Sequence, residues 1–174
     1  MLFLRSSAAL AAVVFLSATY GASAHVTLET QQAVAGSTYK AVIRVSHGCD
    51  GSATTRIRVR IPEGVIAVKP QPKPGWELTT TVGKLPQPYD AGHGRTVTEG
   101  VIEVSWAGGK LADDHYDEFV LRAQLPSRPG VLYFPIVQDC EKGVHRWIEI
   151  PASGKTLDDY KEPAARLTVT PRTP

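Results

Sequence analysis

The sequence predicts an all-β protein built as a β-sandwich, and three features support this. Apolar and polar residues alternate in several short runs, most clearly at residues 39–45 and 56–61. Clusters of proline and glycine separate the runs, as at Pro62-Glu63-Gly64, and such clusters are typical of turns. No helical period extends far along the chain. Many short strands joined by turns indicate two packed sheets.

Each expected strand follows from its local pattern. Residues 25–29 are a candidate first strand, and residues 39–45 alternate between apolar and polar positions. In residues 56–61, Ile57, Val59 and Ile61 alternate with three arginines, which predicts a half-buried strand with a cationic face. Further strands are expected at residues 77–82, 101–106, 116–125, 131–138, 146–150 and 166–170. Residues 157–165 can hold one short helical turn, and the polar, glycine-rich residues 87–100 predict a mobile loop.

Residues 1–24 read as a signal peptide. Arg5 supplies the positive start, residues 8–20 are mostly apolar, and Ala22-Ser23-Ala24 has the small residues of a cleavage site. The apolar run is too short for a stable membrane span. We therefore expect an exported protein, periplasmic or secreted, with no stable membrane anchor. Residues 25–174 have a length that fits a single domain.

Composition and motifs exclude several classes of function. The formal net charge is +2, and no basic cluster with interleaved aromatic residues occurs, so we expect no nucleic-acid partner. The sequence has no Gly-x-Ser-x-Gly elbow, no glycine-rich phosphate loop and no His-Glu-x-x-His motif. We therefore expect that the protein is not an enzyme.

The chain has two cysteines, Cys49 and Cys140. They could be soft thiolate ligands for copper, but in an exported protein a disulfide is favoured. The bridge would close a loop of about 90 residues and stabilise the fold by about 4–5 kcal/mol. It would also bring the α-carbons within about 7 Å of each other, and so place His47 and Asp139 in one neighbourhood.

His25 is the most informative residue, because the predicted cleavage makes it the first residue of the mature chain. A terminal histidine offers both its α-amine and its ring Nδ1, and together they can chelate a metal ion. Cu(II) favours such tetragonal nitrogen and oxygen ligands. Both groups must lose a proton to bind, so affinity should fall as the pH drops. The alternative is an ordinary surface residue at a frayed terminus.

The other histidines have weaker signals. His47 lies in the turn sequence His47-Gly48-Cys49-Asp50-Gly51, as a binding residue at a rim or as a plain turn residue. His145 and Trp147 would share one face of a strand and Ile148 and Ile150 the other, so the sequence leaves open which face is buried. Trp147 would then shield a metal site, or simply pack. His93 lies in the expected loop. His115 lies in an acidic run whose spacing does not follow an EF-hand.

Several motifs occur in an order that resembles the YcnI-like family of exported copper-binding domains. They span nearly all of the predicted mature chain: His25-Val26-Thr27, Thr54-Thr55-Arg56-Ile57-Arg58-Val59, Ile61-Pro62-Glu63-Gly64-Val65, Pro72-Lys73-Pro74-Gly75-Trp76, Val104-Ser105-Trp106 with Gly108-Gly109, Tyr116-Asp117-Glu118-Phe119 and Trp147.

The resemblance implies a cupredoxin-like or immunoglobulin-like β-sandwich that binds Cu(II) through a single-histidine brace. His25 matches the brace histidine, and Trp147 matches the tryptophan beside the metal. The family also has an acidic auxiliary ligand, but residues 45–55 carry His47 where that carboxylate is expected. We infer that His47 replaces it. The secondary candidates for metal ligands are Asp139, Glu118, Glu29 and His145.

The expected function is that of a periplasmic copper(II)-binding protein for copper delivery or homeostasis. Its partners would be copper-trafficking proteins of the periplasm, and a metal-bridged dimer remains open. The alternative is a copper-dependent oxygenase of the polysaccharide-cleaving type, which adds a second histidine ring that His47 or His145 could supply. A third interpretation is an adhesion or glycan-binding sandwich without metal.

Overall fold

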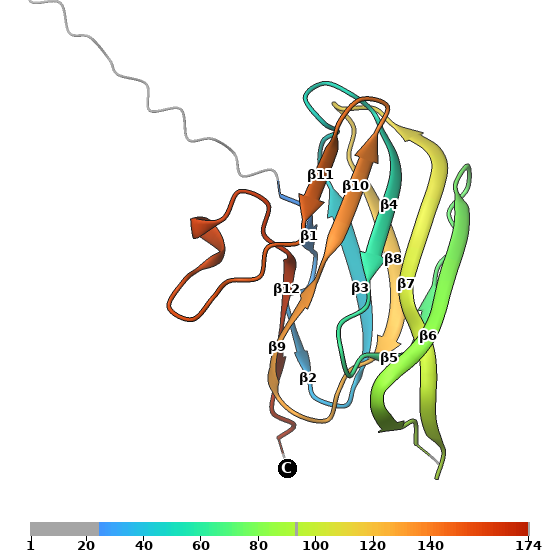
Figure 1. Ribbon diagram of the computed structural model, residues 1–174, viewed down its shortest axis with the longest axis vertical. Coiled ribbons are helices and arrows are strands. Elements are labelled where there is room, and N and C mark those ends of the chain that lie inside the picture. Colours follow the sequence, from blue (N-terminus) through green and yellow to red (C-terminus); the bar gives the residue numbers. More distant parts are fainter. Residues whose placement is uncertain (1–24, 93, 174) are drawn as a thin grey trace, which may run out of the picture.

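The computed structural model describes residues 25–92 and 94–173, which form a β-sandwich with one short 3₁₀ turn, η1 (Leu157–Asp159) (Figure 1). The all-β prediction is confirmed, and so is the helical turn. The predicted signal peptide, its cleavage site and His93 lie outside the described residues.

The strands form three sheets. The first has the order β1 (Thr27–Leu28), β3 (Thr38–Val45), β8 (Asp117–Gln124) and β5 (Ile66–Pro70). The second has the order β11 (Val144–Trp147), β10 (Ile136–Cys140), β4 (Thr54–Arg60), β7 (Thr96–Leu111) and β6 (Glu77–Asp90). The third has the order β2 (Gln32–Val34), β12 (Ala165–Thr170) and β9 (Gly130–Phe134). Pairing is antiparallel in the first two sheets, whereas β2 runs parallel to β12.

Alternation along the strands places the core between the sheets. Ile57 and Val59 of β4 are fully buried, whereas Arg56 and Arg60 are exposed, so the predicted cationic face is confirmed. The largest fully buried side chain is Trp106 of β7, which packs beside Phe119 of β8. Burial of such apolar side chains is the main contribution that holds the sheets together.

The prediction of a mobile loop at residues 87–100 is wrong. These residues end β6 and begin β7, which pair as a long ribbon with Tyr89 opposite Val97. Pro86 and Pro88 fall where the register shifts between Lys84 and Tyr89, on a strand at the edge of its sheet. Proline is tolerated there because an edge strand need not donate every N–H to a neighbour.

Adjacent glycines are typical of turns, yet Gly108 and Gly109 both lie within β7. Gly108 has a φ of +78°, a conformation that glycine adopts readily, and it lies where the pairing of β4 with β7 shifts. A Cβ atom at Gly109 would lie 2.2 Å from the indole of Trp76. Gly108 therefore allows a bulge and Gly109 leaves space for the Trp76 indole, and the strand continues through both.

The structure also shows which face of residues 145–150 is buried. Trp147 is 3% exposed and belongs to the core, whereas Ile148 is 41% and Ile150 52% exposed. The strand β11 ends at Trp147, and the Ile148 N–H turns back to the Arg146 carbonyl at 2.7 Å. Strand alternation therefore does not continue past Trp147.

Candidate metal site

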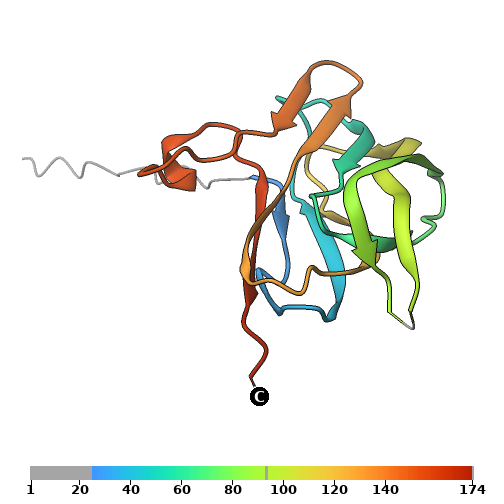
Figure 2. The ribbon, with the colours of Figure 1, turned by 60° about the horizontal axis from the view of Figure 1, so that its bottom comes forward.

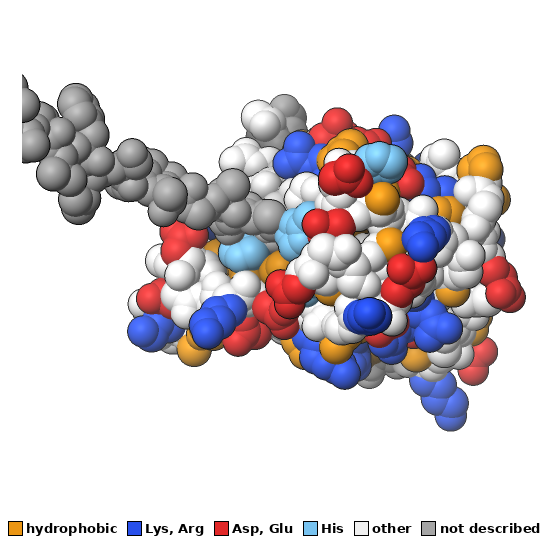
Figure 3. All heavy atoms as spheres, turned by 90° about the horizontal axis from the view of Figure 1, so that it is seen from above, with side chains coloured by type: hydrophobic (Ala, Val, Ile, Leu, Met, Phe, Trp, Pro, Cys, Tyr) orange, Lys and Arg blue, Asp and Glu red, His pale blue; other side chains and the backbone are white. Residues whose placement is uncertain are grey.

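Three histidines from distant parts of the chain meet at one end of the sandwich. His25 lies just before β1, His47 lies just after β3, and His145 lies in β11. Figure 3 looks onto this end, where histidine and acidic side chains lie close together at the surface.

The three imidazoles surround the indole of Trp147. The ring centroid of Trp147 lies 5.4 Å from that of His25, 4.8 Å from that of His145 and 6.3 Å from that of His47. The His47 and His145 centroids are 5.7 Å apart. The structure thus brings together four residues that the sequence singled out, and we call them the histidine–tryptophan cluster.

Trp147 contributes its ring faces to this cluster, because its N–H is engaged elsewhere. The indole Nε1 donates to Gln138 Oε1 at 3.0 Å. Gln138 Nε2 in turn donates to the His47 carbonyl and to Thr54 Oγ1, each at 2.7 Å. Gln138 is fully buried in β10, and sequence reasoning missed it. Gln138 lies two positions after the buried Ile136, so strand alternation places it on the same buried face. A buried amide needs several hydrogen-bond partners, and a glutamine at such a position is therefore a signal for a polar network.

The turn that carries His47 is fixed by backbone bonds. Cys49 and Ser52 exchange two N–H···O bonds of 2.9 Å. Asp50 and Gly51 between them have φ of 48° and 84°, as in the tight Asp-Gly turns of hairpins. A Cβ at Gly48 would lie 1.9 Å from the Ser52 carbonyl oxygen, so only glycine fits that position.

The predicted Cys49–Cys140 disulfide is confirmed, with the two α-carbons 6.0 Å apart. It joins the turn after His47 to the end of β10, two residues beyond Gln138. The Gly48 N–H also donates to Asp113 Oδ1 at 2.9 Å. His47 Nδ1 lies 2.6 Å from the Gly48 carbonyl, which assigns the hydrogen to Nδ1 and the lone pair to Nε2.

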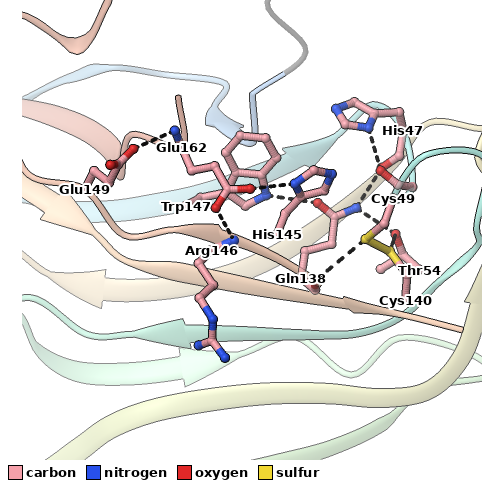
Figure 4. A network of polar contacts seen from close by, with 11 residues as sticks. His47, Cys49, Thr54, Gln138, Cys140, His145, Arg146, Trp147, Glu149 and Glu162 are labelled. Atoms are coloured by element: carbon pink, nitrogen blue, oxygen red, sulfur yellow. Dashed lines mark hydrogen bonds and ion pairs between the residues drawn. A yellow bond between two sulfur atoms is a disulfide. The ribbon is translucent and has the colours of Figure 1, made fainter. Parts of the chain in front are cut away.

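A carboxylate holds His145. Glu162 Oε1 lies 2.7 Å from His145 Nδ1, and Glu162 Oε2 accepts the Arg146 N–H at 2.9 Å (Figure 4). The Glu162 N–H donates to Glu149 Oε2 at 2.7 Å. Sequence reasoning missed Glu162, and no pattern signals it, because it follows an irregular segment 17 residues after His145.

Two of the three secondary carboxylates contact other side chains. Asp139 forms a salt bridge with Arg58 at 3.2 Å, on the opposite face of β10 from Gln138, because successive strand residues point to opposite sides. Glu118 accepts the hydroxyl of Tyr116 at 2.6 Å. Glu29 is exposed. Asp139 and Glu118 are therefore engaged with Arg58 and Tyr116.

The His115 side chain is 69% exposed, and its Nε2 lies 3.7 Å from Asp114 Oδ1. Across residues 25–92 and 94–173, no three histidine, cysteine, aspartate or glutamate side chains converge as a ready metal site. A metal at the cluster would therefore need either a further donor, such as a terminal amine, or a rotation of one of the imidazole rings.

A family model covers most of the chain: the model described as a domain of unknown function, DUF1775, matches residues 25–169. The chain belongs to the DUF1775 family. This is the designation by which the YcnI-like family is known. A comparison with curated proteins gave no match.

Among solved structures, the DUF1775 domain is similar to an uncharacterized protein from Nocardia farcinica, described as having an immunoglobulin-like fold. The two chains share 24% identity, the match covers 83% of this chain and 97% of the other, and the TM-score is 0.62. The immunoglobulin-like sandwich expected for the DUF1775 domain is therefore confirmed.

The Pro72–Trp76 motif of this DUF1775 domain is structural. The Trp76 N–H donates to the Lys73 carbonyl at 3.0 Å, with Pro74 next and Gly75 at a φ of +78°. This is the sequence and geometry of a type II turn. The turn places Trp76 edge-on to Phe119, with ring centroids 4.9 Å apart. In the described ranges, the domain has no helix with the length and apolar character of a membrane span.

Proposed function

We propose that this DUF1775 protein binds copper(II) in the periplasm and takes part in copper delivery or homeostasis, with the metal as its cargo. The observation that carries the proposal is the position of His25. Its ring lies 5.4 Å from Trp147, in a cluster that also contains His47 and His145. The predicted cleavage would make His25 the first residue, and the family match also begins there.

His25 would hold copper through two nitrogens. In the unprocessed chain its backbone nitrogen is an amide, which is a poor ligand. After cleavage the same nitrogen becomes an amine that can bind together with ring Nδ1. His47 would add its Nε2 as the auxiliary ligand, since its Nδ1 faces the Gly48 carbonyl. Imidazole and amine nitrogens suit Cu(II).

Trp147 would cover the site with its ring faces. Because its indole N–H is donated to Gln138, the tryptophan would act through packing, exclusion of water and its π face. An ion held by few ligands at one end of the sandwich can be passed to another protein. Copper-trafficking proteins of the periplasm would be the partners.

Two observations support the proposed compartment. The first is the leader pattern at residues 1–24. The second is the Cys49–Cys140 disulfide, because disulfides persist in oxidising compartments such as the periplasm.

The decisive experiment compares the chain that begins at His25 with the same chain carrying one added alanine before His25. The extension moves the amine away from the ring and leaves the sandwich unchanged. Loss of a direct ligand should weaken Cu(II) binding by about 100-fold or more, since loss of an outer-shell partner alone costs 10–100-fold. Equal affinities would contradict the brace, and equal thermal stability without copper is the control.

One observation favours the rival function of a copper-dependent oxygenase. Such enzymes add a second histidine ring to the terminal one, and the rings of His47 and His145 lie 5.7 Å apart beside Trp147. Peroxide production by the copper-loaded protein with ascorbate and oxygen separates the two functions. Sustained turnover would support the enzyme, whereas a single reduction without turnover would support the carrier.

A further inference from the structure

We propose that His145 is a further copper ligand and that Glu162 is its positioning residue. The inference rests on the proposed copper function and deepens it, because it names a third imidazole for the same site. The Glu162 contact would determine which nitrogen of His145 faces the metal.

The contact between Glu162 and His145 selects one tautomer. A carboxylate can only accept a hydrogen bond, so Glu162 Oε1 at 2.7 Å places the hydrogen on His145 Nδ1 and the lone pair on Nε2. In Figure 4 the second ring nitrogen lies on the side of the ring away from Glu162, toward His47. A histidine that donates its second nitrogen to a carboxylate is the usual arrangement behind a metal-binding imidazole.

The carboxylate is itself held in place. Its Oε2 accepts the Arg146 N–H at 2.9 Å, which ties Glu162 to the backbone of β11. Its own N–H donates to Glu149 Oε2 at 2.7 Å, and the Glu149 N–H donates to the Glu162 carbonyl at 3.2 Å. These contacts anchor the end of the segment between β11 and β12, which projects from the sandwich on the side away from the β6–β7 ribbon (Figures 1 and 2).

The plane of the His145 ring is also set. Its ring lies 4.8 Å from that of Trp147 with an interplanar angle of 30°, and only 22% of the side chain is exposed. Glu162 fixes one edge and Trp147 one face, so Nε2 is the ring nitrogen that would bind the metal. The three rings do not converge as they stand, so the amine of the processed chain must join them or one ring must turn. His25, His47 and His145 would then supply nitrogen donors, the type that Cu(II) favours.

A purely structural role for the pair is the rival explanation, because Glu162 also ties the projecting segment to β11. The two roles differ in what they predict for copper. A structural pair affects the stability of the metal-free protein, whereas a positioned ligand affects copper affinity and the number of coordinated rings.

The test uses the chain that begins at His25, with His145→Ala and Glu162→Gln as variants. The matched controls are His115→Ala and Glu77→Gln, both at exposed positions outside the cluster. Cu(II) dissociation constants come from competition titrations, and pulsed EPR counts the coordinated imidazoles. His145→Ala removes a direct ligand, so we expect it to weaken binding by about 100-fold or more and to lower the count by one ring, with both controls unchanged.

Glu162→Gln keeps the size of the side chain but can donate a hydrogen bond to Nδ1, which favours the wrong tautomer. We expect it to fold and to weaken Cu(II) binding by about tenfold. Unchanged affinity and an unchanged ring count in both variants would overturn the inference while leaving the brace intact. If the unaltered processed chain binds no copper, the proposed function fails, and this inference fails with it.

Discussion

Gln138 is the residue that joins the histidine–tryptophan cluster to the core. It is fully buried, and its amide contacts the Trp147 indole, the His47 carbonyl and the Thr54 hydroxyl. Each of these groups would lose its partner if the amide were removed. A buried polar group without a partner costs far more than the net value of the hydrogen bond.

Gln138→Leu should therefore destabilise the protein. The change leaves three buried or half-buried polar groups without the amide, so we expect a loss of roughly 2–4 kcal/mol in the free energy of unfolding. Urea unfolding measures it, with Gln32→Leu on the exposed side of β2 as the matched control. A loss no larger than that of the control would mean that the amide is not the link between cluster and core.

Tyr39 gives the fold a dependence on alkaline pH. The side chain is 4% exposed and its hydroxyl donates to the Thr30 carbonyl. Burial, with a further contribution from Glu29, raises the pKa of Tyr39 from 10.0 to about 12. The unfolded chain therefore releases this proton at a lower pH than the folded one. The stabilisation is fully present below pH 10 and is lost as the pH rises toward 12.

Tyr39→Phe should flatten this pH dependence. We expect the wild type to lose on the order of 2 kcal/mol more than the variant between pH 10 and pH 12. Near neutral pH the variant should be about 1 kcal/mol less stable, since the Thr30 carbonyl loses its donor. Chemical unfolding across the pH range gives both values, and parallel curves for the two proteins would refute the assignment to Tyr39.

At the scale of elements, the disulfide joins the two segments that carry the site. The turn after His47 begins where β3 ends, and β10 carries Gln138. The bridge between Cys49 and Cys140 therefore fixes the distance between this turn and β10. The bridge spans a sequence separation of 91. It therefore restricts the unfolded chain as well as the site.

Replacing both cysteines by alanine should lower the free energy of unfolding by about 4–5 kcal/mol. It should also weaken Cu(II) binding, because the turn that carries His47 loses its link to β10. A double-mutant cycle with His47→Ala tests whether the disulfide affects copper binding through His47. If the bridge acts through His47, then His47→Ala costs less affinity in the cysteine-free protein. Strictly additive losses would mean that the bridge serves stability alone.

The elements also show which features a sequence can predict. The strands β3 and β4 were predicted because each buries mainly one face, so apolar and polar residues alternate in their sequences. The β6–β7 ribbon exposes most of both faces, so its polar residues looked like a loop. The disulfide was predictable since two cysteines allow one pair. Glu162 was not, because its contact with His145 depends on the path of the segment between β11 and β12.

At the scale of the whole molecule, the candidate site lies at one end of the sandwich, while the β6–β7 ribbon extends along the other side (Figures 1 and 2). The family match and the immunoglobulin-like neighbour establish the scaffold. Function must then come from side chains placed on that scaffold, because one sandwich architecture supports many activities. The proposed copper site uses the start of the described chain, the turn after β3, and β11.

Copper binding should therefore protect only part of the molecule from hydrogen exchange. A ligand that binds the native state raises the free energy of the local openings that would release it. With the chain that begins at His25, we expect slower exchange on adding Cu(II) in residues 45–55, 136–149 and 160–165. Exchange in residues 80–99 of the ribbon should not change. The alanine-extended chain is the control and should show no copper effect. Protection centred on the ribbon would place the metal elsewhere, because no element of the proposed site reaches that part of the sandwich.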